Sequence, residues 1–238
     1  MGRIGDTKTR LTAWFWRSDL ILFVGVGIVA TGCLAFLLAA DAVSGPGQTD
    51  AQILRALRSS DEAHTPIGPR WLADAARDIT AIGGQTVLVL LIASVLGYLL
   101  IVRRWHAAVF VLAATGGGTL LSVALKGLYS RPRPDVVPHL AHVTSSSFPS
   151  GHSMMSAVVY LTLGALLARF VPGRWTKVYF VGVAVLLALL VGTSRVYLGV
   201  HYPTDVVAGW SAGVAWAMLC WLLARYLQKR GVVERPAV

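Results

Sequence analysis

Three short polar clusters stand out in a chain that is otherwise strongly apolar. They are Lys126 to Arg133-Pro134, then Pro149-Ser150-Gly151-His152, and finally Ser194-Arg195 followed by His201 and Asp205. Together they supply two imidazoles, one carboxylate and three cations. A phosphoryl group in transfer carries spread negative charge, so its chemistry rests on positioning and on cationic clamps. The three clusters therefore predict chemistry on a phosphate group.

The predicted phosphate-binding residues are three cations and a short turn. Arg133 and Arg195 offer planar forks that match phosphate oxygens, whereas Lys126 acts as a point charge. Ser150 and Gly151 come directly before an apolar block, where the free backbone N–H groups and dipole of a helix start favour an anion. Gly151 also lets the backbone approach closely because it has no Cβ.

His201, His152 and Asp205 are the predicted catalytic residues. One imidazole can attack phosphorus while another gives a proton to the leaving alkoxide. A carboxylate is needed to hold the attacking ring in one tautomer, as it is in hydrolase triads. Asp205 follows His201 by four residues, which is close enough in a turn to serve it.

The elements that position these residues are predicted to be membrane-spanning helices. Of the 238 residues, 55% are hydrophobic and only 13% are charged, against about a quarter charged in soluble domains. Apolar blocks approach the roughly 20 residues that cross a bilayer as a helix. Six blocks can be distinguished: 20–40, 79–102, 105–125, 153–168, 178–194 and 206–224. The fold class is thus all-α, a polytopic protein with six transmembrane helices in one domain spanning residues 1–238.

The positive charge predicts the orientation of these helices. With the N-terminus in the cytoplasm, 13 of the 21 Lys and Arg residues fall in inner segments, and eight of the 11 Asp and Glu residues fall in outer ones. The net charge of +10 then faces anionic inner-leaflet lipid, so nucleic acid is not needed as a partner. Residues 1–17 and 226–238 are expected in the cytoplasm, and all three clusters lie at the outer helix ends of a plasma (inner) membrane protein, facing the periplasm or exterior.

Two segments leave alternatives open. The first block resembles a cleaved signal peptide at Ala40-Asp41-Ala42, but its apolar core is longer than the roughly 7–15 residues expected of one. The outer loop 41–78 mixes apolar and basic residues around Ile53 and Trp71. Such a segment either lies in the membrane interface and guides a lipid, or forms a short connecting helix packed on the bundle.

The three clusters together resemble the type 2 phosphatidic acid phosphatase (PAP2) superfamily. The pattern is Lys-x6-Arg-Pro, Pro-Ser-Gly-His and Ser-Arg-x5-His-x3-Asp, complete and in order from Lys126 to Asp205. The resemblance implies that His201 forms a phosphohistidine, that Asp205 orients it, and that His152 protonates the leaving oxygen and then activates water. It also implies that Lys126, Arg133, Ser150, Gly151 and Arg195 hold the phosphate.

The same resemblance implies a metal-independent lipid phosphatase without a cofactor, and no metal-ligand spacing occurs in the sequence. The substrates it suggests are phosphatidylglycerol phosphate, phosphatidic acid and undecaprenyl diphosphate, and the oligomeric state stays open. The rival hypotheses are a phosphotransferase that uses a non-water acceptor, a vanadate-dependent haloperoxidase, and a transporter or channel. The apolar blocks disfavour the haloperoxidase, and the position of the charges at helix ends disfavours a transport pathway.

The remaining polar and sulfur-containing residues match no motif. His139 and His142 are interpreted as solvated loop residues, His64 and His106 as structural or interfacial, and Arg131 as at most a peripheral phosphate contact. Cys33 and Cys220 lie inside apolar blocks and are interpreted as small hydrophobes.

Overall fold

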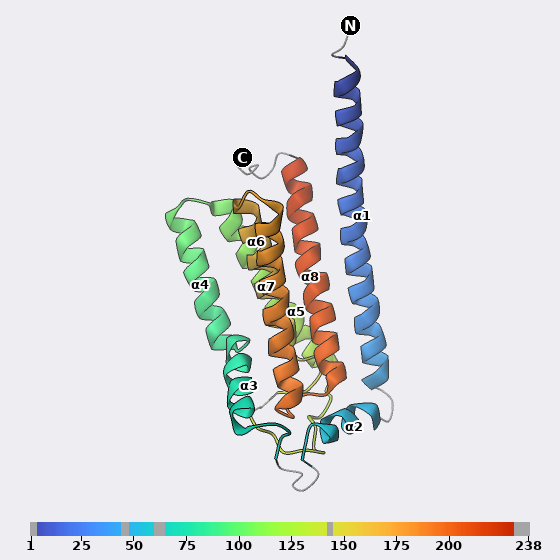
Figure 1. Ribbon diagram of the computed structural model, residues 1–238, viewed down its shortest axis with the longest axis vertical. Helices are drawn as coiled ribbons and strands as arrows, with labels where there is room; N and C mark the ends of the chain where they lie inside the picture. Colours follow the sequence, from blue (N-terminus) through green and yellow to red (C-terminus); the bar gives the residue numbers. More distant parts are fainter. Residues whose placement is uncertain (1–3, 44–47, 60–64, 142–144, 231–238) are drawn as a thin grey trace.

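The computed structural model describes residues 4–43, 48–59, 65–141 and 145–230, and in these ranges it is all-helical apart from one isolated β-bridge. The long helices run side by side in a bundle (Figure 1). In chain order they are α1 (Ile4–Val43), α2 (Gln48–Ala56), α3 (Arg70–Ile82), α4 (Gln85–Ile101), α5 (Trp105–Leu128), α6 (Gly151–Phe170), α7 (Arg174–Tyr197) and α8 (Pro203–Lys229). The predicted fold class is confirmed.

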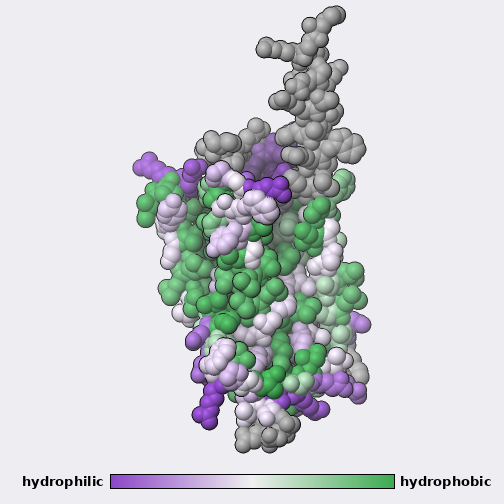
Figure 2. Space-filling view, in the orientation of Figure 1, coloured by the Kyte–Doolittle hydropathy of each residue, from purple (hydrophilic) through white to green (hydrophobic). Residues whose placement is uncertain are grey.

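The helices have the length and hydropathy of membrane spans. Leu22–Val43 of α1 and the whole of α5, α6, α7 and α8 are each long and apolar enough to cross a bilayer, and α3 with α4 makes a sixth span if the bent pair counts as one. Figure 2 shows an apolar band around the middle of the molecule with polar residues at both ends. Side chains such as Phe23 and Leu120 are more than two-thirds exposed. The protein is therefore a multi-pass membrane protein.

The second apolar block is not one helix from Ile79 to Val102, as the sequence predicted. It is broken at Gly83-Gly84, where α3 and α4 meet at a bend of 45°. A Cβ on Gly83 would lie 2.2 Å from Cγ1 of Val191 in α7. The bend touches α7 so closely that only glycine fits, and a glycine pair favours a helix break because it lacks helix propensity.

The last three helices extend beyond their apolar blocks into polar residues. His152 lies in the first turn of α6, Arg195 in the last turn of α7 and Asp205 in the first turn of α8. Most of the N-terminal segment 1–17 is helical, because α1 starts at residue 4. The C-terminal segment 226–238 is helical as far as residue 229, where α8 ends. Residues 1–3 and 231–238 of these segments lie outside the described residues.

Small residues bring the helices together closely. A Cβ on Gly213 of α8 would lie 2.6 Å from the carbonyl oxygen of Met154 in α6, and one on Gly164 of α6 would lie 2.8 Å from the Cβ of Ala184 in α7. Helices in a bilayer gain little from hydrophobic association, so close packing at small residues is a main source of their stability. The helix ends that carry the polar clusters are held together by this packing.

The outer loop forms the two short helices α2 and α3, and both pack on the bundle. Leu54 and Asp50 of α2 are buried, while Ile53 and Trp71 remain exposed. The buried Arg58, just after α2, donates hydrogen bonds to the carbonyl oxygens of Tyr197 and Pro138, at 3.1 and 3.5 Å. These contacts favour the connecting-helix interpretation of this segment. Residues 44–47 and 60–64, including His64, lie outside the described residues.

Candidate active site

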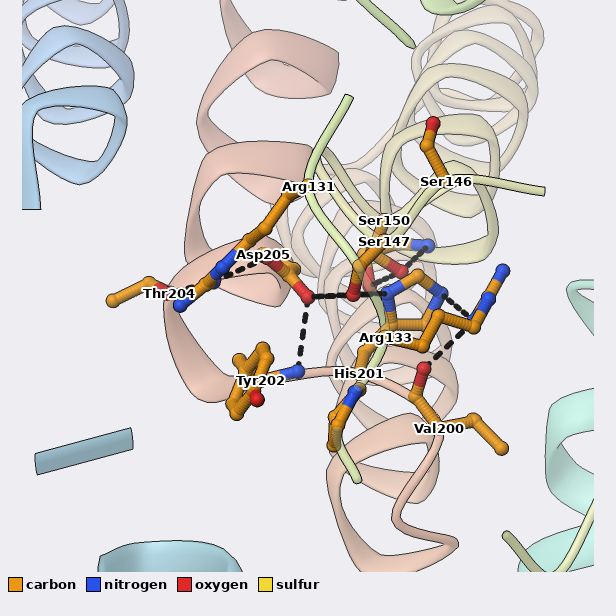
Figure 3. Close-up of polar contacts among 12 residues, drawn as sticks. Arg131, Arg133, Ser146, Ser147, Ser150, Val200, His201, Tyr202, Thr204 and Asp205 are labelled. Carbon is orange, nitrogen blue, oxygen red and sulfur yellow. Dashed lines mark hydrogen bonds and ion pairs between the residues drawn. The ribbon is translucent and has the colours of Figure 1, made fainter. Parts of the chain in front are cut away.

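The three polar clusters meet at one end of the bundle. There α5 and α7 end, and α6 and α8 begin (Figure 1). Figure 3 shows side chains from these ends, and from the loop between α5 and α6, turned toward one another. Segments up to 80 residues apart in the sequence thus contribute to a single cluster.

His201 lies at the centre of this cluster in the short α7–α8 connection, and it is only 1% exposed. Its Nδ1 is 3.4 Å from Oδ2 of Asp205. Its Nε2 is 3.2 Å from the NH1 group of Arg133. A carboxylate only accepts hydrogen bonds, so the Asp205 contact favours the proton on Nδ1. The lone pair of Nε2 then points toward Arg133.

The imidazole of His201 is held in its neutral form. Burial lowers the pKa of His201 to about 4, although the hydrogen bond and negative charge of Asp205 act in the opposite direction. A neutral imidazole has a free lone pair at neutral pH, which an attacking nitrogen requires. The structure therefore leaves one ring nitrogen of His201 unprotonated at neutral pH.

Asp205 is fixed by the start of α8. Pro203 occupies the first turn of this helix, where its missing N–H costs nothing. The Oδ2 atom of Asp205 accepts a hydrogen bond from the backbone N–H of Tyr202 at 2.9 Å. The carboxylate thus caps the helix and faces His201 at the same time. Its position relative to the ring follows from the helix turn between them.

A run of three serines anchors the site. The hydroxyl of Ser147 donates to Oδ2 of Asp205 and lies 3.4 Å from Nδ1 of His201. The carbonyl oxygen of Ser146 accepts a hydrogen bond from Nζ of Lys126 at 2.8 Å, and that of Ser145 accepts one from Nε of Arg133 at 2.7 Å. Each serine therefore holds one predicted site residue through its backbone or its hydroxyl.

An aromatic cluster holds this serine segment in place. Phe148 is fully buried, and its ring lies 5.0 Å from that of Tyr129 at the end of α5 and 5.7 Å from that of Phe36 in α1. Aromatic pairs at these separations contribute beyond the area that they bury. The side chain of Phe148 thus links the loop that carries the serines to two helices.

Arg195 enters the cluster from the end of α7 and is almost fully buried. Its NH1 group donates to the hydroxyl of Thr80 in α3 at 2.9 Å. Its buried Nε atom has no hydrogen-bond partner among the described residues. A buried donor without a partner is costly, and an oxygen of a bound phosphate would satisfy it.

His152 lies within electrostatic range of His201 and of the three cations. The charges of Arg195, His201, Arg133 and Lys126 all act on its imidazole. Lys126 in turn interacts with Arg133, Asp205 and Arg195. The structure therefore brings together the two histidines, the carboxylate and the three cations that the sequence singled out.

The start of α6 is built against both Lys126 and α8. A Cβ on Gly151 would lie 3.3 Å from Cε of Lys126. The Ser150 hydroxyl caps α6 by accepting from the backbone N–H of Ser153, and the backbone N–H of Ser150 donates to the carbonyl oxygen of Asp205 at 2.9 Å. The helix start, with its partial positive charge, thus lies beside the ammonium group.

Arg131, which the sequence suggested as at most a peripheral phosphate contact, binds two carboxylates. Its NH1 group lies 2.6 Å from Oδ1 of Asp205, and its NH2 group lies 2.9 Å from Oδ2 of Asp50 in α2. The same guanidinium donates to the hydroxyl of Thr204 at 2.8 Å and lies 4.1 Å above the ring of Tyr202. These contacts place Arg131 at Oδ1 of Asp205, whereas His201 faces Oδ2 of the same carboxylate.

Sequence reasoning missed Asp50, Thr80 and Ser147 as parts of this site, and it gave Arg131 at most a peripheral contact with phosphate. The serine run directly before Phe148-Pro149 was a signal, because polar runs are unusual in so apolar a chain. No sequence signal pointed to Asp50 or Thr80, since both lie far from the three motifs along the chain. His139 is exposed and contacts the carbonyl oxygen of Pro134, while His142 lies outside the described residues. Within the described ranges, no three His, Cys, Asp or Glu side chains gather as metal ligands.

Comparison with known proteins agrees with this geometry. The family model of the PAP2 superfamily matches residues 105–229, which contain all three clusters. Phosphatidylglycerophosphatase B of Bacillus subtilis is 38% identical over 165 residues, covering 67% of this chain and 80% of that protein. A lipid A 1-phosphatase of Rhizobium johnstonii is 33% identical over 109 residues, covering 42% of this chain and 41% of that protein.

The fold has a close counterpart among solved structures. The crystal structure of a transmembrane PAP2-type phosphatidylglycerolphosphate phosphatase from Bacillus subtilis superposes with a TM-score of 0.76 at 32% identity, covering 84% of this chain and 96% of that one. The family model matches more than half of the chain, and phosphatidylglycerophosphatase B of Bacillus subtilis is matched over 80% of its length at 38% identity. The protein therefore belongs to the PAP2 superfamily.

Proposed function

We propose that this protein hydrolyses a phosphomonoester or diphosphate on a membrane lipid through a phosphohistidine on His201. The observation that carries the proposal is the neutral, buried imidazole held between Asp205 at Nδ1 and Arg133 at Nε2. A ring oriented from one side, with an unprotonated Nε2 that faces a cation, is the arrangement that attack on a phosphate requires. The reaction as proposed uses neither a metal nor a cofactor.

In the first step, Nε2 of His201 attacks phosphorus and the bond from phosphorus to the lipid oxygen breaks. The proton on Nδ1 stays on the ring, and Asp205 stabilises the positive charge that the phosphorylated ring acquires. His152 gives a proton to the leaving oxygen, so the lipid departs as an alcohol or a monophosphate. Arg133, Arg195 and Lys126 neutralise the phosphoryl oxygens, and the Ser150 hydroxyl and the Gly151 N–H are the proposed neutral donors.

In the second step, water replaces the lipid. His152, now neutral, takes a proton from the water, whose oxygen attacks phosphorus. The bond between phosphorus and Nε2 breaks, and inorganic phosphate and the free His201 ring are released. The cycle returns both histidines to their starting protonation states.

The membrane setting supports a lipid substrate. The cluster lies at the ends of membrane helices, at the depth where the headgroup of a lipid sits. We place this end at the outer face of the plasma (inner) membrane, because the Lys and Arg residues are concentrated at the other end. Phosphatidylglycerol phosphate is the first substrate to test, since the Bacillus subtilis relatives are named for acting on it. Phosphatidic acid and undecaprenyl diphosphate follow, and a Sulfolobus acidocaldarius relative is named for the latter.

The test is phosphate release by the purified full-length protein from these three lipids in mixed micelles. The His201→Gln variant should lose release by at least about a thousandfold, as enzymes do when their nucleophile is removed. His106→Gln is the matched control, because His106 lies at the opposite end of α5. Unchanged release by His201→Gln would exclude this residue as the nucleophile.

The closest alternative is a phosphotransferase in which an alcohol or sugar replaces water in the second step. Product analysis separates the two, because a transferase forms a new phosphate ester and releases little free phosphate. A transporter or channel would release no phosphate from any of the lipids.

A further inference from the structure

A cavity lies at the end of the bundle opposite the cluster around His201. It has a volume of about 440 Å³ and is formed between the start of α5 and the ends of α6 and α8. Ligand pockets commonly enclose about 300–1,000 Å³, so its size suits a small molecule or part of a lipid. The length of α5 separates the two sites by about 30 Å, because a helix rises about 1.5 Å per residue.

The interior of this cavity is apolar. Its walls include Phe110 and Ala113 from α5, Leu166 from α6, and Leu223 and Leu227 from α8. The three helices carry no charged residue among these wall positions. An occupant must therefore offer a hydrocarbon surface to this part of the cavity, since an unpaired polar group there would be costly.

The rim of the same cavity is cationic. Arg104 precedes α5, and Arg169 lies in the last turn of α6. With the Gln228 amide turned so that its oxygen faces Arg169, as hydrogen bonding requires, the Arg169 guanidinium donates to that oxygen at 2.7 and 2.9 Å. No Asp or Glu is among the residues that line the cavity, and neither arginine forms an ion pair within the described part of the chain. Among the residues that the structure describes, the rim thus offers two positive charges and no carboxylate that pairs with them.

We propose that this cavity binds one anionic phospholipid, with an acyl chain between α5, α6 and α8 and its phosphate against Arg104 and Arg169. The rim lies at the start of α5 and the end of α6, and Figure 2 shows polar residues at both ends of the apolar band, where lipid headgroups would lie. An apolar interior below two cations matches an anionic lipid in shape and charge. In the orientation proposed above, this lipid belongs to the inner leaflet. The site is separate from the catalytic cluster and does not depend on the proposed reaction.

The test is native mass spectrometry of the full-length protein in detergent with equal amounts of phosphatidylserine and phosphatidylcholine that carry the same acyl chains. Anionic lipid gains about 1 kcal/mol, or about fivefold, for each arginine near the surface, so the wild type should retain phosphatidylserine about 25-fold better. Arg104→Gln and Arg169→Gln should each lower this preference about fivefold. Ala113→Phe, which fills the cavity but keeps the charges, should lower retention of both lipids.

Two matched controls complete the experiment. Arg174→Gln removes a charge at the same end of the bundle but outside the cavity, and Ala30→Phe adds a ring on an exposed face of α1. Both should keep the wild-type preference. Equal retention of the two lipids by the wild type would overturn the proposal, as would an Arg174→Gln effect as large as that of Arg169→Gln. If Arg169→Gln does not fold, Arg104→Gln and Ala113→Phe decide the question.

Discussion

Arg131 should be a positioning residue for Asp205, the proposed orienting carboxylate of His201. Its guanidinium bridges Asp205, at 2.6 Å, and Asp50, at 2.9 Å, with side chains that are at most 10% exposed. In Arg131→Gln, Oδ1 of Asp205 loses its charged partner, while Oδ2 keeps the Tyr202 N–H and the Ser147 hydroxyl. A hydrogen bond to a charged group contributes about 1.5–3 kcal/mol. If all of this energy serves to hold Asp205 in the transition state, kcat/KM falls about 10- to 150-fold, at 1.36 kcal/mol per factor of ten.

The assay is phosphate release from a lipid phosphate in mixed micelles, with kcat and KM determined separately. The loss should fall mainly on kcat, because Arg131 does not touch the proposed phosphate position. Arg131→Lys keeps the charge but cannot bridge two carboxylates, so its kcat should be intermediate. Asp50→Asn should have a smaller effect, since the Arg131–Asp205 pair survives. A folded Arg131→Gln protein within twofold of the wild-type kcat/KM would refute the reasoning.

Three further predictions concern packing, pH and the serine run. Gly209→Ala should lower stability by about 1–3 kcal/mol in thermal unfolding, because its Cβ would lie 2.6 Å from the backbone carbonyl oxygen of Ser150 at the cap of α6. Gly182→Ala should be neutral or stabilising, because the space around Gly182 is open. Equal losses of stability in the two variants would contradict the packing argument. The pKa of His201 is about 4 in the folded protein and about 6.5 in the unfolded chain, so the free energy of unfolding should fall as the pH drops from about 6.5 to about 4. His201→Gln should make this dependence of stability on pH less steep. An unchanged pH dependence in the variant would reject the low pKa. Ser147→Ala removes a hydrogen-bond donor to the Asp205 carboxylate and should lower kcat/KM at least about tenfold. Ser146→Ala should keep a kcat/KM near the wild-type value, because Ser146 contacts Lys126 through its backbone carbonyl. A larger loss in Ser146→Ala than in Ser147→Ala would contradict the assigned contacts.

The amino-acid sequence alone predicted the membrane helices and most of the residues that meet around His201. Long uncharged blocks leave a helix as the simplest way to satisfy the backbone in lipid, so five spans could be predicted with only their ends in doubt. The cluster was predictable because His201 and Asp205 are separated by one helical turn, and because Ser150-Gly151 begins a helix. These are local relations, which spacing along the chain records directly.

Only the tertiary structure decided which distant residues support that cluster. Asp50 and Thr80 reach Arg131 and Arg195 across 81 and 115 residues, and no pattern in the sequence links them. The break at Gly83-Gly84 likewise depends on Val191 of α7, against which the bend packs. Such contacts are set by which helices lie side by side, and this depends on close packing between whole surfaces rather than on any local periodicity.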